Sequence, residues 1–511
     1  MQSFLIVLYL LTLAVLALYG VHRSALLWLY VRHRREQPAP KARYSEADLP
    51  RVTIQLPMFN EMYVVRRLID AVARIDYPSD RLEIQVLDDS TDATSAIARR
   101  RCAALRDEGL DIRYVHRKER TGYKAGALEE GLVRAEGDFV LVFDADFVPE
   151  PGIVRELVHF FTDPAVGMVQ ARWSHLNPDQ SLLTRCQAMF LDGHFVIEHA
   201  ARNRSGRFFN FNGTAGMWRK ATIVDAGGWQ HDTITEDMDL SYRAQLAGWK
   251  FVYAPQVNVP AELPYDMSSF KGQQYRWAKG SAQTARKLLG TIMRAPVPAK
   301  VKAEAYFHLT NNLVYVFLLL LAALQLPNML IRRQMDNPEL LMLDVPLFLA
   351  TCGSVATFYV IAQRDLHGGW TTAVRRLPGM MALGIGLAVN NGRAVLVGLL
   401  GGDVEFVRTP KRGDVEEAAG SQDARYQGTW SWHNTIELGF ALYCSITLVV
   451  AVVTRSWASI PFVLLFCVGF LYVGGMSLYE GLRIRRPQGE SERTEQAPST
   501  HSSPRPQSML S

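Results

Sequence analysis

The sequence predicts an α/β domain, built on a mainly parallel β-sheet covered by helices, that is inserted between apolar helical ends of the chain. Short apolar stretches alternate with helical patterns through residues 45–290, as in such sheets. Residues 1–31 and much of 306–481 are apolar enough for membrane helices. The apolar stretch Phe139–Phe143 runs directly into Asp144 and Asp146, as expected of a buried central strand with acids at its carboxyl end.

Residues 1–31 are nearly all apolar and are predicted to form a membrane helix, because the stretch is too long for a signal-peptide core. Arg32, Arg34 and Arg35 follow it directly. Basic residues at the end of a membrane helix are typical of its cytoplasmic side. We therefore expect residues 45–290 to form a cytoplasmic domain at the inner or plasma membrane.

Within this domain, each expected strand is a short run rich in β-branched or aromatic residues. The expected strands are Val52–Leu56, Ile84–Leu87, Ile112–Val115, Phe139–Phe143, Val166–Ala171 and Phe251–Tyr253. Helical patterns separate them at Asp92–Arg106, Ala125–Arg134 and Gly152–Phe161.

The C-terminal part is predicted to contribute two membrane helices within residues 306–363 and two within 434–481. Residues 377–399 are also apolar but contain Pro378, Asn390 and Arg393, so this segment either spans the bilayer or lies in its interface. An interfacial position leaves residues 377–433 on the cytoplasmic side and agrees better with the basic residues after 481. Residues 487–511 are rich in Pro, Ser, Gln and Glu and are predicted to be disordered.

Overall composition excludes several functions. The net charge of +5 gives no support for a nucleic-acid partner. The five cysteines are scattered without a Cys-x-x-Cys pair, so neither a disulfide framework nor a zinc site is expected. This usage fits a reduced, cytoplasmic catalytic region.

Asp144 and Asp146 form the most informative pair, because ligands bind at the carboxyl ends of parallel strands. Two carboxylates at i and i+2 can share one hard divalent cation, whose other ligands are usually phosphate oxygens. Such a pair by itself is a weak signal, since acids at strand ends are often only solvated turns. The remaining motifs must decide between the two interpretations.

Two motifs near the expected strand ends fit a nucleotide. Asp88 and Asp89 end the second strand, where either carboxylate could accept hydrogen bonds from a base. Lys124 lies where a glycine-containing loop enters a helix, and helix starts favour anions such as phosphates. The plainer alternatives are a helix cap in the first case and a solvated lysine in the second.

Two later motifs fit the chemistry of transfer. Asp237, beside Glu236 at a helix start, could remove a proton from an attacking hydroxyl, although acids in a first helical turn often only balance the helix dipole. Gln273, Arg276 and Trp277 precede the membrane region. Arg276 could pair with a diphosphate and Trp277 could stack on a sugar ring. A simple Arg-Trp anchor at the bilayer surface is the alternative.

Taken together, the ordered motifs resemble the family 2 membrane glycosyltransferases, and most closely the cellulose-synthase-like mannan and glucan synthases of plants. The resemblance covers roughly residues 50–290. It rests on the segments QLPMFNE (55–61), QVLDDSTD (85–92), GYKAGA (122–127), QARW (170–173), FNGTAGMWR (211–219), GGW (227–229), EDMDL (236–240) and QQYRW (273–277).

The resemblance implies a GT-A-type, Rossmann-like fold and assigns roles to individual residues. It places Asp88 or Asp89 at the base, Lys124 at the diphosphate, and Asp144 and Asp146 at the nucleotide and metal. Asp237 would be the general base, and Asn212, Gly213, Thr214, Gln273 and Trp277 would lie near the acceptor, with Arg276 at the leaving group. Phe406, Thr409 and Lys411 match a gating loop of cellulose synthases, although Arg408 replaces the family's valine.

We therefore expect inverting transfer of a hexose from UDP-glucose or GDP-mannose to a growing β-1,4-linked polysaccharide. The expected cation is Mg²⁺ or Mn²⁺, because all predicted ligands are oxygens. The alternative is transfer of a single sugar to a membrane lipid, such as diacylglycerol or ceramide, since Gln-x-x-Arg-Trp also occurs in lipid-specific relatives. A non-enzymatic scaffold is disfavoured because Asp144, Asp146 and Asp237 are all present.

Overall fold

The computed structural model of the chain describes residues 2–335, 339–401, 411, 413 and 432–485. The predicted disordered tail, 487–511, and two residues of the predicted gating loop, Phe406 and Thr409, lie outside the described residues.

The described chain contains a seven-stranded sheet with the strand order β3-β2-β1-β4-β6-β5-β7. Its strands are β1 Val52–Met58, β2 Leu82–Asp88, β3 Ile112–His116, β4 Phe139–Val142, β5 Val166–His175, β6 Gly216–Arg219 and β7 Lys250–Ala261. All neighbouring strands pair in parallel except β6, which is antiparallel to β4 and β5. The predicted mainly parallel α/β fold is therefore confirmed.

β4 lies at the centre of this sheet and is buried on both faces. Phe139 and Leu141 belong to a core that contains residues of α2, α3 and α5, while Val140 and Val142 belong to a second core on the opposite face. Successive side chains of a strand point to opposite faces, so an uninterrupted apolar run is needed to fill both cores. This is why the apolar run before Asp144 predicts the central strand correctly.

Two features of the sheet differ from the sequence-based expectation. β6 is missing from that expectation because glycine and arginine occupy its two ends, which leaves no apolar run, and because it closely follows the turn around Gly213. β7 continues to Ala261, well beyond Tyr253, although it contains Pro255 and Pro260. Among the described residues β7 is an edge strand whose ladder is with β5, apart from an isolated bridge between Ala261 and Phe147. An edge strand tolerates proline because one row of its N–H groups has no ladder partner.

The described chain contains the three helices predicted within the sheet domain, with α5 ending at Val158 before the predicted Phe161, and further helices that the patterns do not indicate. Before the C-terminal part they are α1 Gln2–His33, α2 Val65–Val72, α3 Thr94–Asp107, α4 Tyr123–Arg134, α5 Ile153–Val158, α6 Leu182–Gly193, α7 Ala200–Arg204, α8 Lys220–Asp225, α9 Glu236–Leu246 and α10 Met267–Arg294. They continue with α11 Ala299–Thr310, α12 Val314–Met335, α13 Glu339–Phe348, α14 Ser354–His367, α15 Thr371–Gly386, α16 Ala388–Leu400, α18 Trp432–Val453 and α19 Ile460–Arg485. A π-helical turn, η4 (His194–His199), joins α6 to α7.

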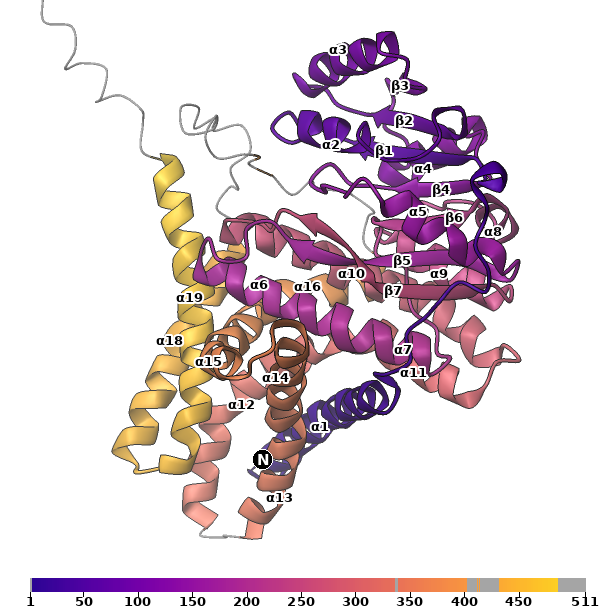
Figure 1. Cartoon of the computed structure of the whole chain (residues 1–511). Helices are drawn as coiled ribbons and strands as arrows, with labels where there is room; N and C mark the ends of the chain where they lie inside the picture. The colour runs from indigo at the N-terminus through magenta and orange to yellow at the C-terminus, as the bar shows by residue number, and fades with distance from the viewer. Residues whose placement is uncertain (1, 336–338, 402–410, 412, 414–431, 486–511) are drawn as a thin grey trace, which may run out of the picture.

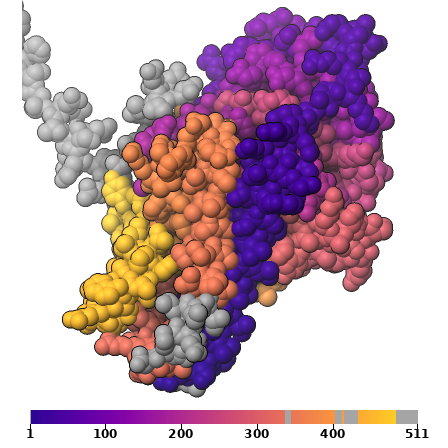
Figure 2. All heavy atoms as spheres, turned by 60° about the horizontal axis from the view of Figure 1, so that its bottom comes forward, coloured from indigo at the N-terminus to yellow at the C-terminus, as the bar shows by residue number. Residues whose placement is uncertain are grey.

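The sheet domain and the apolar helices form two regions, with α6, α7, α10 and α16 between them (Figure 1). The helices α12, α13, α14, α18 and α19 extend away from the sheet on one side. Although α1 begins the chain, it packs against α12 and α14, and Figure 2 shows its indigo surface beside the orange later helices. The two apolar ends of the chain therefore assemble into one bundle.

Five helical segments among the described residues are long and apolar enough to cross a membrane. They are Gln2–His33, Ala299–Met335, Asp344–His367, Trp432–Val453 and Trp457–Leu482. They overlap the five segments that the sequence predicts.

The ambiguous segment 377–399 lies within a bent pair of helices. α15 and α16 meet at Leu387 with an angle of 44° between them. The bend lies where the end of α15 crosses α19 closely, since a Cβ on Gly386 would lie 2.3 Å from the backbone oxygen of Gly469. A long apolar run thus gives two helices here, because contacts with α19 and α10 hold the two halves in different directions.

Gly137, two residues before β4, offers a test of how closely the chain approaches β1. A Cβ there would lie 2.5 Å from the backbone nitrogen of Thr53, so we expect Gly137→Ala to destabilise the domain by about 1–3 kcal/mol. The measurement is the apparent melting temperature of the full-length protein in detergent, which should fall by several degrees. Gly152→Ala is the matched control, because its Cβ would be no closer than 3.4 Å to the nearest atom, Glu156 Oε1. Equal melting temperatures for both variants would contradict the expected close approach.

Candidate active site

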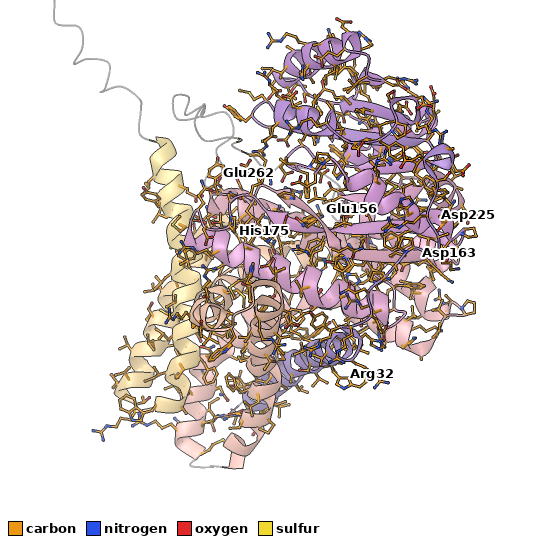
Figure 3. The ribbon with its side chains drawn as sticks, viewed as in Figure 1. Arg32, Glu156, Asp163, His175, Asp225 and Glu262 are labelled. Carbon is orange, nitrogen blue, oxygen red and sulfur yellow. The ribbon has the colours of Figure 1, made fainter. Side chains whose placement is uncertain are left out.

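A cavity lies at the carboxyl ends of β1, β4 and β5, next to α10. Figure 3 marks this end of the sheet with His175 and Glu262, which line the cavity, while Asp163 and Asp225 lie at the opposite end. Most of the residues predicted from the sequence line it. They are Asp89, Lys124, Asp144, Asp146, Asn212, Gly213, Glu236, Asp237, Gln273, Arg276, Trp277 and Lys411.

Asp144 and Asp146 follow β4 into this cavity, and each carboxylate meets a lysine. Lys124 Nζ lies 2.5 Å from Asp144 Oδ1, and Lys411 Nζ lies 2.7 Å from Asp146 Oδ2. Burial raises the pKa of Asp144, and the Lys124 ammonium opposes this effect. The two carboxylates therefore lie together at the strand end, and each is paired with a lysine ammonium group.

Lys124 connects several parts of the site. It lies in the first turn of α4, which begins at Tyr123, and donates a hydrogen bond to the backbone oxygen of Gly213 at 2.9 Å. Its Nζ also lies 3.9 Å from Glu236 Oε1. Burial alone would lower the pKa of Lys124, but the surrounding carboxylates, with Asp144 foremost, outweigh burial and raise it. Lys124 is therefore held as a cation inside the cavity.

Asp237 lies in the first turn of α9, beside Glu236. Burial, followed by the negative charge of Glu236, raises the pKa of Asp237 to about 7, although Lys124 opposes this rise. A carboxylate with a pKa near neutrality is suited to general-base catalysis, because a large fraction is deprotonated at pH 7 and still accepts a proton readily. Gly213 packs closely against this group, since a Cβ on Gly213 would lie 3.2 Å from Asp237 Oδ2 and its φ is +81°.

Gln273, Arg276 and Trp277 line the cavity from α10. Their spacing of i, i+3 and i+4 places them on one face of the helix, as the sequence pattern indicates. Burial lowers the pKa of Arg276 to about 10, with Asp144 and Glu61 opposing the effect. Arg276 remains a cation at neutral pH and lies where an anionic group could enter.

The structure separates the two acids at the end of β2. Asp88 is fully buried and does not line the cavity. Its carboxylate accepts hydrogen bonds from Ser90, Ser95 and Tyr114 and contacts His116. Asp89 lines the cavity and forms a bidentate ion pair with Arg117, at 2.7 and 2.5 Å. Of the two predicted alternatives for base recognition, only Asp89 is placed in the cavity wall.

Of the predicted acceptor segment, Asn212–Thr214, only Asn212 and Gly213 line the cavity. Gly213 faces the cavity, whereas Thr214 is fully buried, and its Oγ1 accepts a hydrogen bond from the backbone N–H of Asp144 at 2.9 Å. The side-chain amide of Asn212 is turned toward two histidines, His194 and His199. Thr214 therefore positions the end of β4 rather than lining the site.

Several lining residues are absent from the sequence-based set of site residues. Trp173 and His175 come from the end of β5, and His175 Nε2 lies 3.1 Å from Asp192 Oδ1. Arg120 contributes a guanidinium 3.5 Å from the centroid of the Phe59 ring. Glu262 lines the cavity beyond β7, and its backbone oxygen accepts a hydrogen bond from Lys411 at 2.6 Å. The position of His175 at a strand end is a signal that could have identified it.

Comparisons with known proteins identify the family of the chain. A family model described as "Glycosyltransferase like family 2" matches residues 50–280. Glucomannan 4-beta-mannosyltransferase 2 of Arabidopsis thaliana is 47% identical over 253 residues, which cover 48% of this chain and 47% of the relative. Glucomannan 4-beta-mannosyltransferase 1 of Oryza sativa subsp. japonica is 36% identical over 409 residues, which cover 77% of this chain and 76% of the relative. The match thus spans about half of the first relative and three quarters of the second.

Among solved structures, the chain is similar to mannosyltransferase PcManGT from Pyrobaculum calidifontis in complex with GDP-Man and Mn2+. That similarity has 23% sequence identity and a TM-score of 0.48, and it covers 69% of this chain and 99% of the other. The sequence matches carry the assignment, because the rice relative is more than 30% identical over more than two thirds of both chains. The chain therefore belongs to glycosyltransferase family 2, and the predicted enzyme class, a hexosyltransferase of that family, is confirmed.

Proposed function

We propose that this protein transfers a hexose from a nucleotide diphosphate sugar to a growing β-1,4-linked polysaccharide, with inversion at the anomeric carbon. The observation that carries the proposal is Asp237, a carboxylate whose pKa is raised to about 7 in the same cavity as the Asp144–Asp146 pair and Arg276. The names of the relatives, glucomannan 4-beta-mannosyltransferases, support a mannosyl donor and a β-1,4 product. A glucosyl donor is the second choice.

In the proposed reaction, Asp237 accepts the proton of the acceptor hydroxyl as that oxygen attacks the anomeric carbon. The glycosidic bond to the donor diphosphate breaks on the opposite face, so an α-linked donor gives a β-linked product. Lys124 and Arg276 supply positive charge for the diphosphate as negative charge develops on it. Asp89 faces the cavity where it could accept hydrogen bonds from the base. Trp277 and Gln273 would border the acceptor.

The carboxylates of Asp144 and Asp146 fit a hard divalent cation, Mg²⁺ or Mn²⁺, because they offer oxygen ligands at the end of one strand. The ammonium groups of Lys124 and Lys411 pair with these carboxylates in the structure, and a cation bound there would displace them. Among the described residues no cluster of three or more His, Cys, Asp or Glu side chains could hold a metal, so donor phosphates and water would supply the other ligands. When bound, the cation would neutralise charge on the leaving diphosphate.

The metal proposal predicts that chelation abolishes transfer. Treating the purified protein with excess EDTA should reduce hexosyl transfer to background, because the diphosphate would lose its counter-charge at Asp144 and Asp146. Adding Mg²⁺ or Mn²⁺ back should restore the rate, measured with a radiolabelled donor. Full transfer after chelation, in buffer freed of trace metal, would overturn this assignment.

The proposed activity is tested by the product. Purified full-length protein, supplied with labelled GDP-mannose, UDP-glucose or UDP-GlcNAc, should incorporate label from one of the first two into a chain that a β-1,4-mannanase or β-1,4-glucanase degrades. Size separation distinguishes the polymer from a single-sugar lipid. A lipid product carrying one sugar would replace the polymer proposal, and no transfer from any donor would overturn both.

The same assay tests the proposed orientation, in which the sheet domain lies on the cytoplasmic side and the bent pair α15–α16 lies at the interface. Arg32, Arg34 and Arg35 after α1 support this orientation. Donor added outside sealed membrane vesicles should be used by inside-out vesicles and left untouched by right-side-out vesicles. The opposite pattern would reverse the orientation.

The role of Asp237 predicts that Asp237→Asn lowers kcat by about 10²–10⁴-fold, because the amide cannot accept the proton. Donor binding, measured by calorimetry, should change little. Asp232→Asn is the matched control, since Asp232 is an exposed acid of the same loop region that pairs with Lys287 at 2.7 Å. Retained turnover in Asp237→Asn would show that another group is the base.

A pH profile makes the same assignment independently. The base works only when deprotonated, so kcat/KM should fall about tenfold for each pH unit below about 7 and level off above it. The residual activity of Asp237→Asn should lack this acidic limb. An unchanged limb in the variant would assign the limb to a different group.

A further inference from the structure

The side-chain amide of Asn212 is held at both ends by two histidines. His199 Nε2 lies 2.5 Å from Asn212 Oδ1, and Asn212 Nδ2 lies 3.0 Å from His194 Nε2. The centroids of the two imidazole rings are 4.3 Å apart. We call this arrangement of His194, Asn212 and His199 the amide clamp.

The clamp depends on the local shape of the helix that supplies the histidines. His194 and His199 are five residues apart and are the first and last residues of the π-helical turn η4. In a regular α-helix, residues i and i+5 point in clearly different directions, whereas the wider π-turn brings them toward the same side. The interruption between α6 and α7 thus allows both rings to reach one side chain.

The chemistry of the clamp specifies the position of each proton. His199 is buried, and this burial holds its pKa well below the usual range, so the neutral ring donates from Nε2 to Asn212 Oδ1. Asn212 Nδ2 is a donor, so His194 Nε2 must accept with a lone pair. The proton of His194 then lies on Nδ1, which is 3.0 Å from Glu198 Oε2. One tautomer of each histidine satisfies all three contacts.

The backbone next to the clamp touches the catalytic groups. Gly213, the following residue, accepts the hydrogen bond of Lys124 at 2.9 Å and packs against Asp237. Thr214, next in the chain, accepts a hydrogen bond from the N–H of Asp144. A shift of Asn212 would therefore move the contacts of the base, the lysine and the predicted metal ligand together.

Glu198 connects the clamp to further charged side chains. Glu198 Oε2 lies 3.3 Å from Arg202 Nη1, and Arg202 Nε lies 2.8 Å from Glu304 Oε1 of α11. The other oxygen of this carboxylate, Glu304 Oε2, lies 3.1 Å from His22 Nε2 of α1. The titratable and charged groups near His194 are Glu198, His199 and Arg202 from the same helical segment, Glu304 and His308 from α11, Arg23 from α1 and Tyr359 from α14. The clamp is thus supported from elements outside the sheet.

We propose that His194 is a positioning residue for glycosyl transfer, which accepts the hydrogen bond of Asn212 and thereby holds Gly213 against Lys124 and Asp237. On this view Asn212 acts through its neighbours instead of binding the acceptor with its amide. The inference rests on the proposed function, because transfer is the activity it modulates.

The first test separates loss of the hydrogen bond from loss of the ring. His194→Leu should lower kcat by about 10–100-fold with little change in the KM for the donor, because small misplacements at a reacting centre have effects of this size. His194→Gln should recover most of the rate, since its amide oxygen can accept from Asn212 Nδ2. His33→Leu, at the end of α1, is the control and should retain the wild-type rate.

The second test uses Asn212→Asp, which replaces the donor Nδ2 by an acceptor. A carboxylate at position 212 can only accept, so His194 must donate from Nε2 while its Nδ1 still donates to Glu198. Both ring nitrogens then carry protons, so the kcat of this variant relative to Asn212→Ala should rise as the pH falls. The negative charge of the new aspartate would by itself raise the pKa of Asp237. This effect would shift the pH dependence of kcat toward alkaline pH, opposite to the rise at low pH that the clamp predicts. The double variant His194→Gln with Asn212→Asp should lose the acidic shift, because glutamine donates at every pH.

The outcomes distinguish the clamp from the function it serves. If the wild-type protein transfers no hexose, the proposed function fails. If the wild type is active and His194→Leu, folded by gel filtration, turns over at the same rate, the clamp is overturned. If His194→Leu does not fold, His194→Gln and Asn212→Asp decide, and an Asn212→Asp profile without an acidic shift relative to Asn212→Ala overturns it.

Discussion

The buried contact between Lys124 and Asp144 is the interaction on which the site depends. It joins the start of α4 to the end of β4, and the same ammonium reaches the backbone of Gly213 and lies near Glu236. Without this cation, Asp144, Glu236 and Asp237 would concentrate negative charge in one partly buried cavity. Such charges are costly to bury unless they are paired. The lysine makes the cluster of acids compatible with folding while leaving Asp237 with a raised pKa.

A second set of contacts ties this site to the apolar helices through α10. Glu480 of α19 accepts hydrogen bonds from the backbone N–H groups of Met267 and Ser268 at the start of α10. About one turn after Met267 on α10, Lys271 Nζ lies 2.6 Å from Glu437 Oε1 of α18. The next turn of α10 carries Gln273, Arg276 and Trp277 into the cavity. The position of these three side chains is therefore set by the C-terminal helices as well as by the sheet.

Much of the fold can be read from local sequence patterns. The apolar run of β4, buried on both faces, predicts the central strand, and parallel strands bring their carboxyl ends to one edge. That rule alone predicts that Asp88 or Asp89 lies near Asp144 and Asp146. β6 escapes prediction because its sequence, with glycine and arginine at the ends, contains no apolar run to detect. The extent of β7 escapes because Pro255 and Pro260 are compatible with a strand only when its edge position is known.

The sequence by itself indicated most of the acids and cations that gather at the site, because strand ends, helix starts and the family motifs mark them, although Arg120 and Glu262 were not among them. Only the tertiary structure decided where each of them lies and what it contacts. Asp88 and Asp89 are adjacent in sequence, yet one is enclosed by Ser95 and Tyr114 and the other faces the cavity. The raised pKa of Asp237 and the closure of His194 and His199 on Asn212 have the same origin. Burial and contacts between segments distant in sequence produce both, and neither is encoded in a local pattern.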